Sequence, residues 1–335
     1  WSKYVEQVYD LNIDVDISVT TDIDVSKDVI VLSYNSATTT DTDLVFLERN
    51  NPENVVAELD IGSGIFAIDA TDDYVFVAAN STSSQFAVVD ISNIQNPILV
   101  STLPLTAVDS FGSYPQGRSI FFFEDKIYLG TKETAGPEFH VFDVTNPAFP
   151  FELGYIELTH NVNDIQVRDG IAYLATSADT QELIVVDVSL PWSMSERGYF
   201  NAGTFLANDR DATALYLIGN TLYMGRKRGS SLNPELYAID ISSSTSPVML
   251  WSKYLSLSHH TSYVSGIARR GNVLFVSTHD QERGLILFNI LNLSEIEEMV
   301  SVPDVAWSSF DIFEDKIYAP NGIDLSLSVI KSYEK

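Results

Sequence analysis

The chain has 335 residues, of which 45% are hydrophobic and 19% charged, so it can bury a large core and global disorder is not expected. Its 46 acidic residues against 19 basic ones give a net charge of −27, which disfavours binding to nucleic acids and anionic membranes. It contains no cysteine, which excludes disulfides, thiol catalysis and thiolate metal sites.

In chain order, a short strand is expected at residues 4–9, followed by seven copies of one strand pattern. Each copy has an apolar strand, a polar turn, a second apolar strand, a loop, and a third strand that in most copies ends in a polar or charged residue. The second strands are marked by Val31, Phe76, Tyr128, Tyr173, Tyr223, Phe275 and Tyr318, which lie 43 to 52 residues apart. The third strands end at Glu48, Asp90, Asp143, Asp187, Asp240, Asn289 and Lys331. Repeats of this length are typical of β-propellers.

A fourth strand is expected after proline, at residues 97–101, 151–155 and 247–251, because proline suits a strand at a sheet edge. The pattern predicts an all-β fold, a seven-bladed β-propeller of four-stranded antiparallel blades that forms one domain over residues 1–335. The approximate repeats are 17–60, 61–106, 107–158, 159–205, 206–257, 258–303 and 304–335. The last copy lacks a fourth strand, and we expect the outer strand within residues 1–12 to supply it and close the ring.

Several third strands and the turns after them share a recognisable sequence pattern. Residues 87–93 read Ala-Val-Val-Asp-Ile-Ser-Asn, residues 183–189 read Leu-Ile-Val-Val-Asp-Val-Ser, and residues 141–147 read Val-Phe-Asp-Val-Thr-Asn-Pro. This apolar run ending in Asp resembles the LVIVD repeat family, and the resemblance extends over seven degenerate copies. The copies ending in Glu48, Asn289 and Lys331 depart most from it.

The resemblance implies an exported or surface β-propeller, and it implies no particular activity. We therefore expect an extracytoplasmic location, whether periplasmic, secreted or surface-anchored. Because the chain opens at Trp1 rather than Met, a signal or anchor segment is expected to have been removed. No apolar run reaches the length of a membrane span. The repeated Asp is expected to accept backbone N–H groups in the following turn, which is a structural role.

Loops of a rigid scaffold are the usual place for a binding site. In a propeller, the loops from fourth to first strands and from second to third strands emerge on one face. The ligand-binding candidates on that face are Tyr114, Arg118, His160, Arg210, Arg226, Arg228, His259, His260, Tyr263 and Trp307. The second-to-third loops also contain Lys132, Lys227, His279 and Arg283.

Two functions remain open for this face. The first is a non-catalytic, monomeric binding or scaffolding protein that holds a protein or a glycan there, with no catalytic residue assigned. The alternative is a lyase or hydrolase that acts on an anionic polysaccharide at the mouth of the central channel. Arginine would then neutralise a carboxylate or sulfate, and histidine or tyrosine would move the proton.

No cofactor is firmly implied by the sequence. The histidines show no zinc spacing, whereas clustered carboxylates suit calcium, and the candidate ligands are Asp14, Asp16, Asp209 and Asp211. None of these clusters matches the EF-hand loop, so a solvated acidic surface is the competing interpretation.

Overall fold

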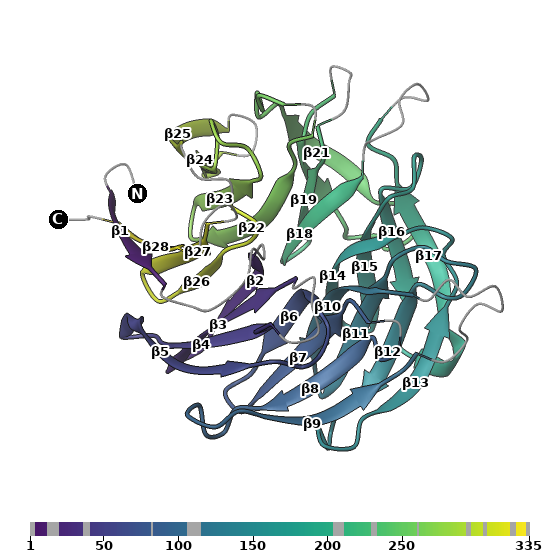
Figure 1. Ribbon diagram of the computed structural model, residues 1–335. Coiled ribbons are helices and arrows are strands. Elements are labelled where there is room, and N and C mark those ends of the chain that lie inside the picture. The colour runs from purple at the N-terminus through teal and green to yellow at the C-terminus, as the bar shows by residue number, and fades with distance from the viewer. Residues whose placement is uncertain are drawn as a thin grey trace. The chain divides into compact units, whose positions relative to one another are not determined.

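The computed structural model describes residues 4–11, 20–35, 41–81, 83–105, 115–203, 211–228, 233–259, 261–292, 296–303, 307–321 and 326–332. These residues form seven separate four-stranded antiparallel sheets (Figure 1). The fold class predicted from the sequence, a seven-bladed β-propeller with four-stranded antiparallel blades, is confirmed. The described residues contain one short 3-10 turn, Pro191–Ser193, and no helix among them is long and apolar enough to cross a membrane.

The chain divides into two compact units. The first unit contains Val162–Ser308, and the second contains Val5–Asn161 with Ser309–Ser332. The first unit has three sheets. The first consists of β14 (Val162–Arg168), β15 (Ile171–Thr176), β16 (Leu183–Asp187) and β17 (Ser195–Phe200), and the second of β18 (Ala212–Ile218), β19 (Thr221–Arg226), β20 (Leu236–Asp240) and β21 (Val248–Lys253). The third consists of β22 (Val264–Arg270), β23 (Val273–Thr278), β24 (Leu285–Asn289) and β25 (Glu297–Val302).

The second unit has four sheets. The first consists of β2 (Thr20–Val25), β3 (Val29–Tyr34), β4 (Leu44–Glu48) and β5 (Asn51–Leu59), and the second of β6 (Ile65–Ala70), β7 (Tyr74–Ala79), β8 (Phe86–Asp90) and β9 (Ile98–Leu103). The third consists of β10 (Gly117–Phe123), β11 (Lys126–Thr131), β12 (Phe139–Asp143) and β13 (Phe151–Ile156). The fourth consists of β26 (Asp311–Phe313), β27 (Lys316–Pro320), β28 (Ser326–Ser332) and β1 (Tyr4–Asp10). In the last of these, β1 lies beside β28, the position expected for the N-terminal strand. Closure of a complete ring by this strand remains a prediction.

The second and third strands of each sheet form the core. All seven second-strand marker residues are at most 4% exposed. The third strands from β4 to β24 share one pattern, with four buried residues followed by a half-buried last residue. A strand covered on both faces needs apolar residues at every position, which explains why the sequence shows apolar runs rather than alternation.

The turns after five of the seven third strands are held as the sequence predicted. The Oδ1 atoms of the strand-end residues accept the backbone N–H of the residue two positions later. These contacts are Asp90 to Ser92 (2.9 Å), Asp143 to Thr145 (2.9 Å), Asp187 to Ser189 (3.0 Å), Asp240 to Ser242 (2.8 Å) and Asn289 to Leu291 (3.0 Å). The repeated Asp therefore caps a turn in four sheets, and Asn replaces it in a fifth.

Carboxylates on the first strands join neighbouring sheets within each unit. One oxygen of each carboxylate accepts a backbone N–H from the first strand of the adjoining sheet. The pairs are Asp22 with Ile68 (3.0 Å), Asp24 with Ala70 (2.7 Å), Asp69 with Phe122 (2.7 Å) and Asp311 with Val25 (2.8 Å) in the second unit, and Asp164 with Leu215 (2.6 Å) in the first. These bonds satisfy edge N–H groups that the sheets' own ladders leave unpaired.

The four carboxylates of the second unit are crowded and acquire unusual acidities. Burial raises the pKa of Asp22 to about 6 and the pKa of Asp69 to about 7. Burial, followed by the charges of Asp311, Asp69 and Asp22, raises the pKa of Asp24 well above its ordinary value. The pKa of Asp311 is also raised by burial. Each side chain keeps part of its surface accessible to solvent.

Candidate functional site

Three loops of the first unit are tied together through their backbones. The N–H of Arg228 donates to the carbonyl of Ser262 at 2.8 Å, and the N–H of His279 donates to the carbonyl of Tyr263 at 2.9 Å. Lys227 and Tyr263 also form an isolated antiparallel bridge. We call residues 227–228, 257–259, 261–263 and 278–283 the joined loops. Because each loop pairs with the next, their side chains are presented by a rigid backbone.

Two aromatic rings stack within the joined loops. The ring of His279 lies parallel to the ring of Tyr263, with centroids 5.1 Å apart and an angle of 4° between the planes. His279 is exposed and Tyr263 is half-buried, so the stack presents an imidazole to solvent on an aromatic support. Such a pair can stack on the face of a sugar or a planar group, and the imidazole nitrogens can hydrogen-bond to it.

Asp280 fastens two of the joined loops from below the surface. Its Oδ2 accepts hydrogen bonds from the Ser258 N–H (2.6 Å), the Ser258 hydroxyl (2.8 Å) and the Ser262 hydroxyl (2.7 Å). Its Oδ1 accepts the N–H of Glu282 at 3.0 Å. Burial opposes ionisation, but the bonds from Ser262 and Ser258 outweigh it and lower the pKa of Asp280. The carboxylate is therefore an ionised structural acceptor at neutral pH.

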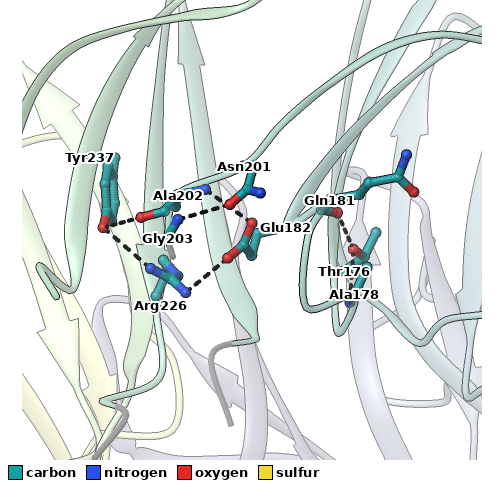
Figure 2. Close-up of polar contacts among 9 residues, drawn as sticks. All are labelled: Thr176, Ala178, Gln181, Glu182, Asn201, Ala202, Gly203, Arg226 and Tyr237. Atoms are coloured by element: carbon teal, nitrogen blue, oxygen red, sulfur yellow. Dashed lines mark hydrogen bonds and ion pairs between the residues drawn. The ribbon is translucent and has the colours of Figure 1, made fainter. Parts of the chain in front are cut away.

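Arg226, at the end of β19, points into the protein rather than toward a ligand (Figure 2). Its Nη2 lies 3.0 Å from Oε1 of Glu182, and its Nη1 donates to the Tyr237 hydroxyl at 3.2 Å. The Tyr237 hydroxyl in turn donates to the carbonyl of Ala202 at 3.0 Å, and Glu182 Oε2 accepts the Ala202 N–H at 3.0 Å. Arg226 is 1% exposed and Glu182 is fully buried. This network anchors the loop after β17.

The Glu182 contact is one case of a repeated cap that the sequence pattern did not predict. In five sheets, the polar residue directly before the third strand accepts the N–H of a residue just after the fourth strand. These caps are Asp43 to Ile61 (2.9 Å), Gln85 to Leu105 (2.9 Å), Glu138 to Leu158 (2.9 Å), Glu182 to Ala202 (3.0 Å) and Glu235 to Leu255 (2.8 Å). Burial raises the pKa of Asp43 to about 7 and also raises the pKa values of Glu138 and Glu235.

The remaining candidates in the first unit have different surroundings. The Arg228 guanidinium donates to the carbonyl of Leu257, and His259 is exposed. Trp307 is fully buried, and its backbone N–H donates to the carbonyl of Thr278 at 3.3 Å. Its position therefore makes it a core residue beneath the joined loops and not a surface contact for a ligand.

Other candidates lie in the second unit or outside the described residues. Arg118 lies in β10, at an irregularity in the pairing with β11, and both Arg118 and His160 are half-buried. Tyr114, Arg210 and His260 lie outside the described residues. The structure thus brings Arg228 and Tyr263 together with His279, a loop residue that the sequence placed on the same face.

The structure describes only one of the four calcium candidates. Asp14, Asp16 and Asp209 lie outside the described residues, and the carbonyl of Asp211 accepts the N–H of Lys227 at 3.0 Å. Among the described residues, no three acidic or histidine side chains are grouped so that they could hold a metal ion. Calcium binding stays an untested prediction.

Comparison with known proteins supports the family resemblance. The LVIVD repeat family matches residues 67–103 and 160–202, which fall in the second and fourth predicted copies. No curated protein is significantly similar to the chain in sequence.

Solved structures share the fold at low sequence identity. Virginiamycin B lyase from Staphylococcus aureus has a TM-score of 0.68 at 12% identity, covering 99% of this chain and 100% of that one. BamB from Moraxella catarrhalis has a TM-score of 0.58 at 13% identity, covering 99% of both chains. The Pan2 WD40 domain of Neurospora crassa has a TM-score of 0.64 at 11% identity, covering 95% of this chain and 90% of that one. These similarities are evidence of a common propeller fold only, because one fold hosts many functions.

Proposed function

We propose that this chain, a seven-bladed β-propeller with LVIVD repeats, is a non-catalytic extracytoplasmic binding protein whose joined loops hold a glycan or a protein. The observation that carries the proposal is the His279–Tyr263 stack, which rests on backbone hydrogen bonds between loops. A binding surface gains affinity when its groups are ordered before the ligand arrives, and these loops are ordered by their own contacts.

The charges around the stack favour an anionic ligand. Basic side chains of the joined loops outnumber acidic ones, with Lys227, Arg228 and Arg283 against Asp280 and Glu282, in a chain whose net charge is −27. Of the three, Arg283 is paired with Glu298 at 2.8 Å, so Lys227 and Arg228 carry most of this argument. Since Asp280 is already occupied by four donors, its charge is largely compensated within the protein. A uronic or sulfated glycan could stack on His279 while its acidic groups approach the basic side chains.

The test is a binding titration with neutral, uronic and sulfated oligosaccharides at fixed salt, followed by calorimetry. We expect one anionic glycan to bind and His279→Ala to weaken its binding at least tenfold. The matched control is His259→Ala, because His259 is also exposed in a joined loop but lies outside the stack. Equal binding by both variants, or no binding by any glycan, would remove the glycan from the proposal.

The same titration separates binding from catalysis. A bound glycan recovered intact after long incubation supports the non-catalytic proposal. Release of unsaturated or shortened sugar that depends on His279 would instead establish the alternative of a lyase or hydrolase acting on an anionic polysaccharide. The extracytoplasmic location rests on the family resemblance and is tested by protease accessibility of the native protein in intact cells. Full protection until the cells are broken would contradict it.

A further inference from the structure

Three side-chain amides of the second unit form a continuous hydrogen-bonded row. The Nδ2 of Asn80 donates to the Oδ1 of Asn35 at 3.1 Å, and the Nε2 of Gln116 donates to the Oδ1 of Asn80 at 2.6 Å. Asn35 follows β3, Asn80 follows β7 and Gln116 precedes β10, so the row links three sheets that succeed one another along the chain. We call these three residues the amide row.

The amide row occupies repeat positions that form the candidate site in the first unit. There, the residue directly after a second strand donates its backbone N–H to the residue directly before the first strand, as His279 does to Tyr263. Asn80 takes the position of His279 in its own sheet, and the equivalent backbone bond is 2.7 Å long. Gln116 takes the position of Tyr263 in the following sheet, where that bond is 3.0 Å long. The same part of the repeat therefore presents an aromatic pair in one unit and amides in the other.

The three amides are held in place and still reach solvent. All three residues are half-buried. A side-chain amide has two N–H donors and an oxygen with two lone pairs, so the two bonds of the row leave donors and acceptors on every member. Among the described residues, these three side chains make no other hydrogen bond. The row therefore offers donors and acceptors in an arrangement that is fixed before a ligand arrives, which lowers the entropy lost on binding.

The chemistry of the row differs from that of the joined loops. The joined loops combine an aromatic stack with the basic side chains of Lys227 and Arg228, which favours an anionic ligand. The amide row has no charge of its own, although the chain has a net charge of −27. Carboxamides pair well with hydroxyl groups, because a hydroxyl both donates and accepts a hydrogen bond. A ligand with several neighbouring hydroxyls and no charge therefore fits this row best.

We propose that the amide row is a ligand site of its own, which binds an uncharged sugar through the hydroxyls of its ring. Asn80 is the central contact, because its amide is bonded to both other members of the row. Two neighbouring hydroxyls bond to Asn80 and Gln116 together, each donating to an amide oxygen or accepting from an amide N–H. The site lies in the second unit and does not rest on the function proposed for the joined loops.

The proposal makes a specific prediction about salt. Hydrogen bonds between uncharged groups involve no long-range attraction between charges, so added salt should leave the binding unchanged. An anionic glycan that approaches Lys227 and Arg228 should instead bind more weakly as salt rises, because the ions screen its attraction to those side chains. The salt dependence therefore separates the two sites within one protein.

The experiment is a titration of the purified chain with neutral oligosaccharides of glucose, galactose, mannose and N-acetylglucosamine, followed by nuclear magnetic resonance of the side-chain amide groups. We expect one of these sugars to shift the NH₂ signals of Asn80 and Gln116, with a dissociation constant that is the same at low and at high sodium chloride. Asn80→Ala removes the central amide and Gln116→Ala removes one end of the row. Each change is expected to weaken binding about tenfold, the effect of losing one or two hydrogen bonds to the ligand.

The matched control is Gln95→Ala, which removes an exposed amide from the turn before β9, in the same sheet as Asn80. It should leave the dissociation constant unchanged, and so should His279→Ala, because His279 belongs to the joined loops. Thermal unfolding checks that each variant is folded, and Gln116→Ala carries the test if Asn80→Ala is not. No signal shift with any neutral sugar would overturn the proposal. Binding that both row variants leave intact, or that His279→Ala abolishes, would overturn it too.

Discussion

Replacing Asp69 by Asn tests whether the crowded carboxylates of the second unit make its stability depend on pH. Asp69 lies on β6, and its Oδ2 accepts the N–H of Phe122 on β10 at 2.7 Å. Asparagine keeps an acceptor oxygen for that N–H and removes the negative charge. The variant therefore isolates the effect of the charge from the effect of the hydrogen bond.

The direction and size of the pH effect on stability follow from the pKa values of Asp69 in the folded and unfolded states. Burial, followed by repulsion from Asp22 and Asp311, raises the pKa of Asp69 from 3.8 to about 7, so the folded state binds its proton more tightly than the unfolded state does. Its favourable contribution is complete below pH 4 and is lost as the pH rises through 7. The difference between the folded and unfolded pKa values corresponds to about 2 to 4 kcal/mol of unfolding free energy over the whole pH range. The lower value allows for the contact of the side chain with solvent.

The assay is urea unfolding at pH 5, 7 and 9 for the parent chain and the Asp69→Asn variant. The parent should lose stability between pH 5 and 9, and the variant should lose about 1 to 3 kcal/mol less, with most of the difference arising between pH 5 and 7. Asp240→Asn is the matched control, because hydrogen bonds from Ser242 lower the pKa of that carboxyl. Parallel pH profiles for the parent and Asp69→Asn would refute the reasoning.

Three further changes test other parts of the structure by urea unfolding. Glu182→Gln leaves the buried guanidinium of Arg226 without its counter-charge and should cost about 3 kcal/mol of unfolding free energy. Gly117→Ala should cost about 1 to 3 kcal/mol, because the new Cβ would lie 2.7 Å from a backbone oxygen. Asp280→Asn should destabilise the chain at pH 7, and the loss should shrink as the pH falls below 4, because the lowered pKa makes the ionised carboxylate the stabilising form. A neutral effect of any of these would contradict the contact assigned to it.

The sheets could be predicted because their residues face two buried surfaces. Tyr173 and Tyr223 recur at the centre of second strands, and both are at most 4% exposed. The Asp at the end of a third strand bonds to a backbone N–H only two residues away, as Asp187 does to Ser189. Local contacts of this kind leave a short sequence pattern, and repetition makes the pattern visible.

The candidate site was less predictable because its contacts join residues far apart in the chain. The sequence placed Arg226 among the basic loop residues, and its buried partner Glu182, which lies 44 positions earlier, could not be identified from the sequence around Arg226. Likewise, nothing in the segment around Trp307 indicates that the N–H of this residue bonds to Thr278 and that its ring is buried. The stack of Tyr263 on His279 could be placed on the correct face, but its parallel geometry depends on pairing between loops.

The structure gives many acidic residues a different role from the one that composition suggests. From composition alone, an excess of carboxylates suggests a solvated surface or a cation site. Here carboxylates recur at three positions of the repeat, represented by Asp69 on a first strand, Glu138 before a third strand and Asp143 at the end of one. At each position the carboxylate accepts a backbone N–H that would otherwise be unpaired, and such unpaired groups are costly when buried. An acidic residue at these points of the repeat is therefore a feature of propeller construction, and the search for ligands belongs with side chains outside it, such as His279.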